Sequence, residues 1–244
     1  MEIKEYERMF RLENFYWWFQ GRKKIVLRLV DKFCKKVNPS IILDAGCGTG
    51  MIFSHLEKYG TVVGIDLSKE ALKFCRERRL RPLIMADMVA LPFKNESFDL
   101  IVGLDILEHI EGDSMAIGDF YRALKKDGIL IVTVPAHPFI WSDHDIALHH
   151  VRRYTMKQFK QLISLHQWKV LKISYAISFT FPGVVLYRLI AKMIKRGDEK
   201  PKTDLIILPN FLNSILTYII HIEAFLIQYI RLPFGLSIVA ALKK

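Results

Sequence analysis

Residues 41–50 read IILDAGCGTG, an aliphatic run that leads into an acid and three closely spaced glycines. The run is apolar on both faces, as the strands of a buried parallel sheet are. Glycines let the backbone turn tightly and approach a ligand without interference from a Cβ atom. A helix that follows such a loop presents free backbone N–H groups to the ligand. This stretch therefore predicts a strand, a ligand-binding loop and a helix.

Four more aliphatic runs follow along the chain. They lie at residues 61–66, 81–87, 98–105 and 128–136. Segments with helical spacing of apolar residues separate them, and we expect Ser68 to cap one helix and Gly128 to stop another. Alternating strands and helices of this kind are joined by right-handed crossovers, so the sequence predicts a doubly wound α/β sheet. Ligands bind at the carboxyl ends of the strands in such a sheet.

The pattern changes after residue 150. Residues 155–167 are expected to form one more helix, with Thr155 as its N-terminal cap. Residues 168–178 and 236–244 read as two strands that pair antiparallel at the edge of the sheet.

Residues 181–233, between these two strands, are too apolar for a loop. The segment 205–222 holds 18 residues without Asp, Glu, Lys or Arg. A transmembrane helix needs about 20 apolar residues, and Pro209 and Asn213 interrupt this segment while Glu223 follows it. We therefore expect a helical insertion that covers the active site or lies on a membrane surface.

The composition narrows the class of protein. The chain has 244 residues, of which 51% are hydrophobic, and it carries 36 Lys and Arg against 25 Asp and Glu, a net charge of +11. So apolar a chain can bury a core, which excludes a disordered tail and an acidic solvating segment. The length fits one α/β domain with an elaboration. The positive charge favours anionic partners such as phosphates, nucleic acid or an acidic membrane face.

The three cysteines, Cys34, Cys47 and Cys75, are odd in number and form no Cys-x-x-Cys pair. This pattern excludes a disulfide framework and a zinc site built from cysteines, and it favours a reducing compartment. The first ten residues mix charged and aromatic side chains and lack the apolar core of a secretory signal. We therefore expect a cytoplasmic protein, peripheral at the membrane if the insertion contacts lipid.

Acids also end the second and third aliphatic runs. Asp66 follows Asp44 by 66 − 44 = 22 residues, and a carboxylate at that strand end can accept both hydroxyls of a ribose. Asp87 ends the third run, where a carboxylate can accept an amino group such as N6 of adenine. The glycine spacing differs from the Gly-x-Gly-x-x-Gly of a dinucleotide fold, because the third glycine comes one residue early.

The glycine loop, Asp66, Asp87 and residues 91–110, which read LPFKNESFDLIVGLDILEHI, together resemble the class I S-adenosylmethionine-dependent methyltransferases. The resemblance covers residues 40–136. It implies a Rossmann-like methyltransferase fold, with a doubly wound, mostly parallel seven-stranded sheet and a helical insertion before the last strand. It also implies S-adenosylmethionine as the cofactor.

The same resemblance assigns the cofactor-binding residues. Gly46 and Gly48 would pass under the methionine part, Asp66 would hold the ribose and Asp87 would reach the adenine. The side chains at the end of the fourth strand would flank the sulfonium. The full set that it implies comprises Trp18, Arg22, Asp44, Gly46, Cys47, Gly48, Asp66, Leu67, Asp87, Met88, Leu104 and Asp105.

Two flanking segments, residues 13–22 and 141–155, are similar to a methyltransferase branch often associated with glycan, lipid and secondary-metabolite assembly. Trp-x-x-Gly-Arg and His-Asp…Arg-Arg-Tyr patterns recur in that branch, and this chain has the second with six residues between Asp145 and Arg152. The likeness implies that Trp17, Trp18 and Arg22 lie over the cofactor, with Arg22 able to pair with its carboxylate.

The acceptor site is expected in the loop 137–154. Five of the eight histidines fall between residues 109 and 150, and a neutral imidazole suits a hydroxyl or ammonium acceptor. The candidates for proton removal or orientation are His144, Asp145 and His150, and those for substrate binding are His109, His137, Arg152, Arg153 and Tyr154. Exposure of the His149/His150 pair, and of the arginines at a helix start, is the alternative. We expect no metal, because the His, Asp and Glu residues lack a regular helical spacing.

The residues after the fourth strand bear on the chemical class of the acceptor. The turn at 104–107 lacks the Asn/Asp-Pro-Pro-aromatic sequence that grips a planar amino group, and no cysteine follows the fifth strand. A small or lipid-like O-, N- or C-acceptor remains, and nucleic acid is disfavoured. The basic residues Arg188, Lys192, Lys195 and Arg196 at the margins of the insertion favour lipid and an anionic membrane surface.

Two other classes stay open. An RNA or protein methyltransferase would use the basic surface, and a non-catalytic, membrane-associated protein would bind the cofactor without a competent acceptor pocket. We expect three structural parts: a helical segment at 1–39 that covers the cofactor site, a methyltransferase core at 40–180 and 234–244, and the apolar insertion at 181–233. The oligomeric state is left undetermined.

Overall fold

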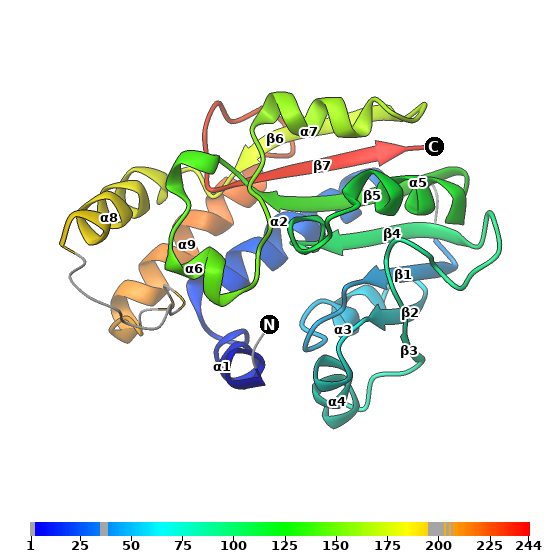
Figure 1. Cartoon of the computed structure of the whole chain (residues 1–244), viewed down its shortest axis with the longest axis horizontal. Coiled ribbons are helices and arrows are strands. Elements are labelled where there is room, and N and C mark those ends of the chain that lie inside the picture. The colour runs from blue at the N-terminus through cyan, green and yellow to red at the C-terminus, as the bar shows by residue number, and fades with distance from the viewer. Residues whose placement is uncertain (1–2, 35–38, 195–202, 204, 206) are drawn as a thin grey trace.

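The computed structural model describes residues 3–34, 39–194, 203, 205 and 207–244. Its centre is a seven-stranded sheet in the order β3-β2-β1-β4-β5-β7-β6 (Figure 1). The strands are β1 Ile41–Ala45, β2 Thr61–Asp66, β3 Leu83–Met85, β4 Phe98–Leu104, β5 Leu124–Pro135, β6 Lys169–Ala176 and β7 Ser237–Lys243. Neighbouring strands from β3 to β5 are parallel, and β7 runs antiparallel to both β5 and β6. The predicted doubly wound, mostly parallel sheet is confirmed.

Helices cover both faces of this sheet. They are α1 Ile3–Leu12, α2 Trp17–Cys34, α3 Phe53–Leu56, α4 Lys69–Glu77, α5 Asp113–Ala123, α6 Asp143–Ala147, α7 Met156–Ile163, α8 Phe181–Ile194 and α9 Asn210–Leu226, with short 3-10 turns η1 Leu107–His109 and η2 Pro138–Ile140. Alternate residues of a strand point to opposite faces, so Ile42 of β1 packs in the core with α2 and α9, whereas Leu43 packs in the core with α5 and α7. Burial on both faces explains why the strand sequences are continuously apolar.

Local capping signals are confirmed at two helices and wrong at a third. The hydroxyl of Ser68 accepts from the backbone of Ala71 at 3.2 Å, and Thr155 caps α7. Gly128 does not stop a helix: α5 ends at Ala123, and Gly128 lies within β5. The pairing of β4 with β5 shifts register beside it, and a Cβ at position 128 would lie 2.8 Å from a backbone oxygen. The absence of a side chain at Gly128 therefore accommodates the irregular pairing of β5 with β4.

The two C-terminal strands pair as predicted. β7 lies antiparallel to β6, with Ser237 opposite Ala176 and Lys243 opposite Lys169. β6 forms the edge, and β7 is inserted between β6 and β5. The last strand of the sequence thus lies inside the sheet, and it returns the chain from the insertion to the core.

The insertion forms α8 and α9 between these strands, which confirms its helical character. α9 packs on α2 so closely that a Cβ on Gly21 would lie 2.4 Å from Ile220. The buried carboxylate of Glu223 accepts from three successive backbone N–H groups after β6, those of Ile177, Ser178 and Phe179. No helix within the described ranges is both long and apolar enough to cross a bilayer.

Candidate active site

A cavity of about 700 Å³ lies at the carboxyl ends of β1, β2 and β4. The twelve residues predicted to bind the cofactor all line it, and α1 and α2 contribute Tyr6, Met9, Trp18 and Phe19 to its wall. Residues of η1, α6 and α8 line the same cavity. One space therefore joins the expected cofactor and acceptor regions.

The glycine loop opens directly onto the cavity. Gly46 and Gly48 have φ angles of +70° and +54°, a region that side chains rarely adopt. A Cβ at Gly48 would meet nothing within 4 Å, so a ligand can approach the backbone there. The carboxylate of Asp66 accepts from the Gly48 N–H at 2.9 Å and from the Ser68 N–H at 2.8 Å. Asp66 thus holds the loop as well as lining the cavity.

Asp44 offers a test of whether the cofactor fits. Its Oδ2 atom is buried and has no hydrogen-bond partner among the described residues, although the residue lines the cavity. Burial, aided by Asp66, raises the pKa of Asp44 to about 8. A cationic donor, such as the ammonium of the methionine part of S-adenosylmethionine, would satisfy this oxygen and stabilise the ionised form.

Cys47 is an inert part of the loop. Its Sγ lies 3.8 Å from the Sγ of Cys75, and this contact together with burial raises the pKa of the Cys47 thiol. A thiolate is the reactive form of cysteine, so the environment of Cys47 suits packing rather than nucleophilic attack.

The roof of the cavity departs from expectation at two residues. Trp18 lines the cavity, but Trp17 is buried in the core, where its ring meets that of Trp18 edge-on at 5.7 Å. Arg22 lines the cavity and pairs with the carboxylate of Asp105. The expected partner of Arg22, a carboxylate of the cofactor, would therefore share this guanidinium with Asp105.

Glu13 is a roof residue that the sequence did not reveal. Its buried carboxylate accepts from Thr49 Oγ1 at 2.6 Å and pairs with Arg78, so it ties the end of α1 to the glycine loop and α4. Burial raises its pKa. Only its place just before Trp17 and Trp18 in the sequence could have signalled this role.

The acceptor side centres on a buried carboxylate at the base of α6. Asp145 Oδ1 accepts from His150 Nδ1 at 2.9 Å and from Arg153 Nε at 2.7 Å, and Oδ2 accepts from the Ser142 N–H at 2.9 Å. Burial alone would raise the pKa of Asp145, but the bond to His150 and the charge of Arg153 outweigh it and lower this pKa well below its usual range. Asp145 is ionised and does not line the cavity, whereas His150 and Arg153 do.

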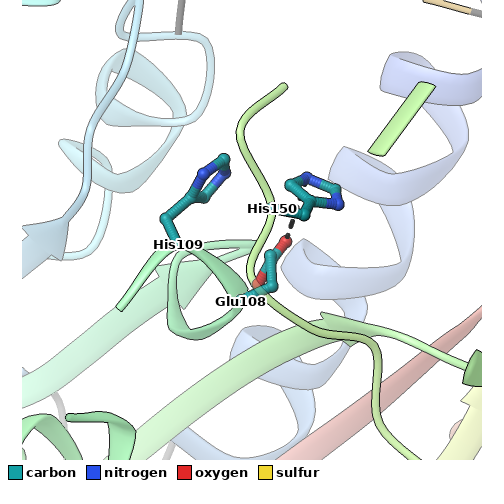
Figure 2. A group of neighbouring side chains, drawn as sticks. All are labelled: Glu108, His109 and His150. Carbon is teal, nitrogen blue, oxygen red and sulfur yellow. Dashed lines mark ion pairs between the residues drawn. The ribbon is translucent and has the colours of Figure 1, made fainter. Parts of the chain in front are cut away.

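Two histidines of the cavity, His144 and His109, are neutral bases. Burial, aided by the charge of Arg188, lowers the pKa of His144 to about 3. Burial and the neighbouring His150 lower the pKa of His109 to about 3 as well. The third histidine, His150, binds Asp145 through Nδ1, and its Nε2 atom lies 4.0 Å from Glu108 Oε1 (Figure 2).

Glu108 is the other residue that the sequence analysis missed. Its side chain is fully buried, lines the cavity, and has no hydrogen bond to either carboxyl oxygen from the residues described. Burial raises its pKa to about 8. Its neighbour His109 was singled out for its histidine side chain, and an acid beside it in a strand-end turn was the available signal.

Three predicted substrate residues lie outside the cavity. His137 stacks on Tyr175 with ring centroids 5.0 Å apart. Arg152 pairs with Asp113 at 2.8 Å, and the hydroxyl of Tyr154 donates to the same carboxylate at 2.8 Å. These contacts tie the loop to α5, and of the predicted substrate residues His109 and Arg153 line the cavity.

Comparison with known proteins agrees with this geometry. Residues 43–132 match the family described as "Methyltransferase domain". The chain is 38% identical over 94 residues to an uncharacterized protein of Methanocaldococcus jannaschii, covering 38% of this chain and 36% of that protein. It is 32% identical to the tRNA (carboxymethyluridine(34)-5-O)-methyltransferase of Arabidopsis thaliana, over 39% of this chain and 24% of the relative.

Another relative at 32% identity is the malonyl-[acyl-carrier protein] O-methyltransferase of Legionella pneumophila, with 46% of this chain and 42% of the relative covered. The chain thus spans less than half the length of these relatives. A solved structure described as a possible histamine N-methyltransferase from Thermotoga maritima aligns with 99% of this chain and 96% of its own, at a TM-score of 0.61 and 16% identity. That likeness shows the fold, and the names of the relatives differ in their acceptors.

Proposed function

We propose that this chain, which carries a class I S-adenosylmethionine-dependent methyltransferase domain with S-adenosylmethionine as its cofactor, methylates a small or lipid-like acceptor by direct in-line transfer. The observation that carries the proposal is a shared cavity that is lined by the glycine loop and Asp66 and by His109, His144 and His150. Sites of about 300–1,000 Å³ are typical for small ligands, and this cavity lies in that range.

The chain supplies orientation, exclusion of water and a place for a proton. Bound S-adenosylmethionine supplies an electrophilic methyl group on a sulfonium. The walls would hold the acceptor atom near this carbon, at about 3–3.5 Å, which accounts for most of the acceleration. An acceptor that must lose a proton can give it to His144, whose lowered pKa keeps it neutral at physiological pH, or to His150.

Apolar residues support a lipid-like acceptor. Val184 of α8, Leu205 and Leu236 line the cavity beside the histidines. The outer faces of α8 and α9 also expose large apolar side chains: Leu186, Tyr187, Leu189, Ile190, Phe211, Ile215, Tyr218, Ile222 and Phe225. Such a surface suits contact with the acyl region of a membrane. We propose that the insertion rests on an anionic membrane while the acceptor enters beside α8.

The basic margin predicted for this surface needs one change. Arg188 lines the cavity and donates to the backbone oxygen of Ile140 at 3.0 Å, so it does not face a membrane. Lys195 and Arg196 lie outside the described residues, as does the side chain of Lys192. The electrostatic part of the proposal therefore rests on these three lysine and arginine residues.

The acceptor is tested with the purified chain and S-adenosylmethionine labelled on its methyl group. Lipid extract, aqueous small-molecule extract, bulk RNA and bulk protein are offered separately. We expect label in a lipid or small-molecule fraction, and roughly tenfold less with Asp66→Ala at limiting cofactor. Label in RNA that falls steeply with salt would support the polymer alternative. Cofactor binding without label in any fraction would support the non-catalytic alternative.

The histidine roles are tested by single substitutions. His144→Ala and His150→Ala should lower turnover while leaving the affinity for S-adenosylhomocysteine unchanged, and His166→Ala on the far side of α5 is the matched control. Full turnover in both variants would contradict the assignment. Loss of cofactor binding would show a structural role instead.

The membrane surface is tested by flotation with vesicles. Binding should require anionic lipid, weaken in high salt and fall several-fold in Phe211→Ser and Tyr218→Ser. Leu165→Ser, which removes an equally exposed side chain beyond α7, should have no effect. A chain that floats with no vesicle, or a dimer interface over α9, would contradict the proposal.

A further inference from the structure

Three side chains in the acceptor half of the cavity carry metal-binding atoms. Glu108 and His109 are neighbours on η1, and His150 comes from the turn after α6. One such atom from each residue lies within 4.8 Å of the other two. Figure 2 shows the three side chains grouped around one space. On the basis of the function proposed above, we infer that Glu108, His109 and His150 bind a divalent transition-metal ion that holds an oxygen atom of the methyl acceptor.

The burial of Glu108 gives an independent reason for a cation. The carboxyl group is fully buried, and neither oxygen has a hydrogen-bond partner within the described part of the chain. A buried carboxylate without a partner is costly, and buried charges are usually paired or bound to metal. His150 Nε2 lies 4.0 Å from Glu108 Oε1, which is too long for a hydrogen bond. A metal ion between them would satisfy the carboxylate.

His150 is already oriented as a ligand. Histidines that bind metal usually donate their other ring N–H to a carboxylate, which fixes the tautomer and the ring. Asp145 accepts from Nδ1 of His150 at 2.9 Å and is itself held by Arg153 at 2.7 Å. Nε2 is then the ring atom left for a metal ion, and it lies 4.0 Å from Glu108 Oε1. The same Asp145 would act as the outer carboxylate of the metal site.

His109 completes the set after a small movement. Its ring meets that of His150 edge-on, with centroids 4.8 Å apart. Metal–nitrogen bonds of about 2.0–2.1 Å in a tetrahedral site bring neighbouring ligand atoms to roughly 3.3 Å from one another. Rotation of the partly exposed His109 side chain can supply this contraction. Two histidines and one carboxylate leave coordination positions open, as in catalytic sites.

The surrounding charges indicate the class of acceptor. Arg22 pairs with Asp105 and Arg153 pairs with Asp145, so these groups largely neutralise each other. Ionised Glu108 cancels one of the two charges of the ion. The remaining positive charge favours an acceptor that presents an anionic oxygen, such as an ionised hydroxyl or a carboxylate.

Coordination would also prepare a hydroxyl for transfer. The ion lowers the pKa of a bound hydroxyl, and because His150 is then a ligand of the ion, the proton passes to His144 or to water. A lone pair of the resulting oxygen forms the bond to the methyl carbon, while the carbon–sulfur bond breaks and its electron pair stays on sulfur. The products are the methyl ether and S-adenosylhomocysteine.

The site is tested by titrating the metal-stripped full chain with Co²⁺, followed by its visible absorption and by calorimetry. We expect one Co²⁺ per chain, at least 100-fold weaker binding in Glu108→Gln and His150→Ala, and about 10- to 100-fold weaker binding in Asp145→Asn. His55→Ala, which changes a histidine on α3 outside the cavity, should bind Co²⁺ as the unchanged chain does. Binding of S-adenosylhomocysteine by each variant serves as the check on folding.

The outcomes separate this inference from the proposed function. No Co²⁺, Zn²⁺ or Mn²⁺ binding, or equal Co²⁺ affinity in folded Glu108→Gln, would overturn the metal site, and methyl transfer in a chelator would then leave the function intact. Co²⁺ binding that depends on Glu108 in a chain that transfers methyl to no acceptor would support the metal site and contradict the function.

Discussion

The two halves of the cavity are built in different ways. In the cofactor half, the loop after β1 and the turn after β2 are joined by hydrogen bonds from the backbone N–H groups of Gly48 and Ser68 to Asp66. In the acceptor half, side chains from η1, α6 and the following turn contact one another, and the carboxylate of Asp145 is at their centre. The first half depends on the course of the backbone, and the second on buried charged side chains.

This difference affects how far each half can vary between related proteins. Backbone groups can bind the same cofactor when the surrounding side chains differ. A site formed by side chains changes the ligand that it fits when those side chains are substituted. The match to the methyltransferase family ends at residue 132, just before the loop that carries α6. The two relatives with stated activities match 39% and 46% of this chain, and their names state different acceptors.

The largest expected effect separates two neighbouring arginines of the acceptor half. Arg153→Met leaves the buried Asp145 carboxylate without its guanidinium partner and should lower the free energy of unfolding by about 3–5 kcal/mol. Arg152→Met removes a partly exposed pair with Asp113 and should cost only about 0–1 kcal/mol. Urea denaturation measures both, and equal costs would contradict the buried network.

The next effect concerns the anchor of the insertion. Glu223→Ala removes the acceptor of three backbone N–H groups after β6 and should lower the free energy of unfolding by about 2 kcal/mol or more. Glu223→Gln retains one accepting oxygen and should cost less. Affinity for S-adenosylhomocysteine, measured by calorimetry on the folded variants, should stay the same. A parallel loss of cofactor affinity would show that the halves are coupled through α9 and α2.

A smaller effect is expected in the cofactor half. Asp66→Ala should weaken S-adenosylmethionine binding by at least about 1.5 kcal/mol, roughly tenfold, because a charge-assisted hydrogen bond is lost. Asp66→Asn keeps an acceptor for the Gly48 N–H and should lose less affinity. Calorimetry measures both variants. Unchanged affinity in Asp66→Ala would remove Asp66 from the ribose, and tight binding of NAD would contradict the cofactor itself.

The last effect is a change of stability with pH, measured per pH unit, and it compares one buried acid from each half. Burial raises the pKa of Asp44 and of Glu108 to about 8, above the value of about 4 in an unfolded chain. The folded chain then binds more protons between these values, so the free energy of unfolding should be highest at acid pH and fall as pH rises towards 8. The slope is at most about 1.4 kcal/mol per pH unit for each acid.

Chemical denaturation in a chelator at a series of pH values measures this slope. Asp44→Asn and Glu108→Gln should each flatten it, and Asp119→Asn, whose exposed acid has a lowered pKa, is the control. A free energy of unfolding that rises from pH 5 to 8 in the unchanged chain would show that neither acid is raised.

Predictions from sequence were correct where the interaction joins residues close in sequence, and they failed where it joins residues far apart in sequence. Ser68 and Thr155 were predicted as caps because each contacts a backbone group three residues away. Gly128 was misread as a helix stop because the pairing of Leu124 with Phe98, a contact distant in sequence, had already ended the helix. Adjacent Arg152 and Arg153 look alike in sequence, and only the fold sends one to Asp113 and the other to Asp145.

The sequence by itself determined the sheet, the glycine loop and the acids at the strand ends, because hydrophobic periodicity and backbone freedom are encoded within a few residues. The tertiary structure alone decided what the acceptor half became. It buried Glu108 without a hydrogen-bond partner among the described residues, brought His109 beside His150, and stacked His137 on Tyr175. Burial and partners depend on segments far apart in the chain, and the same local sequence acquires its charge state and its chemistry only when those segments meet.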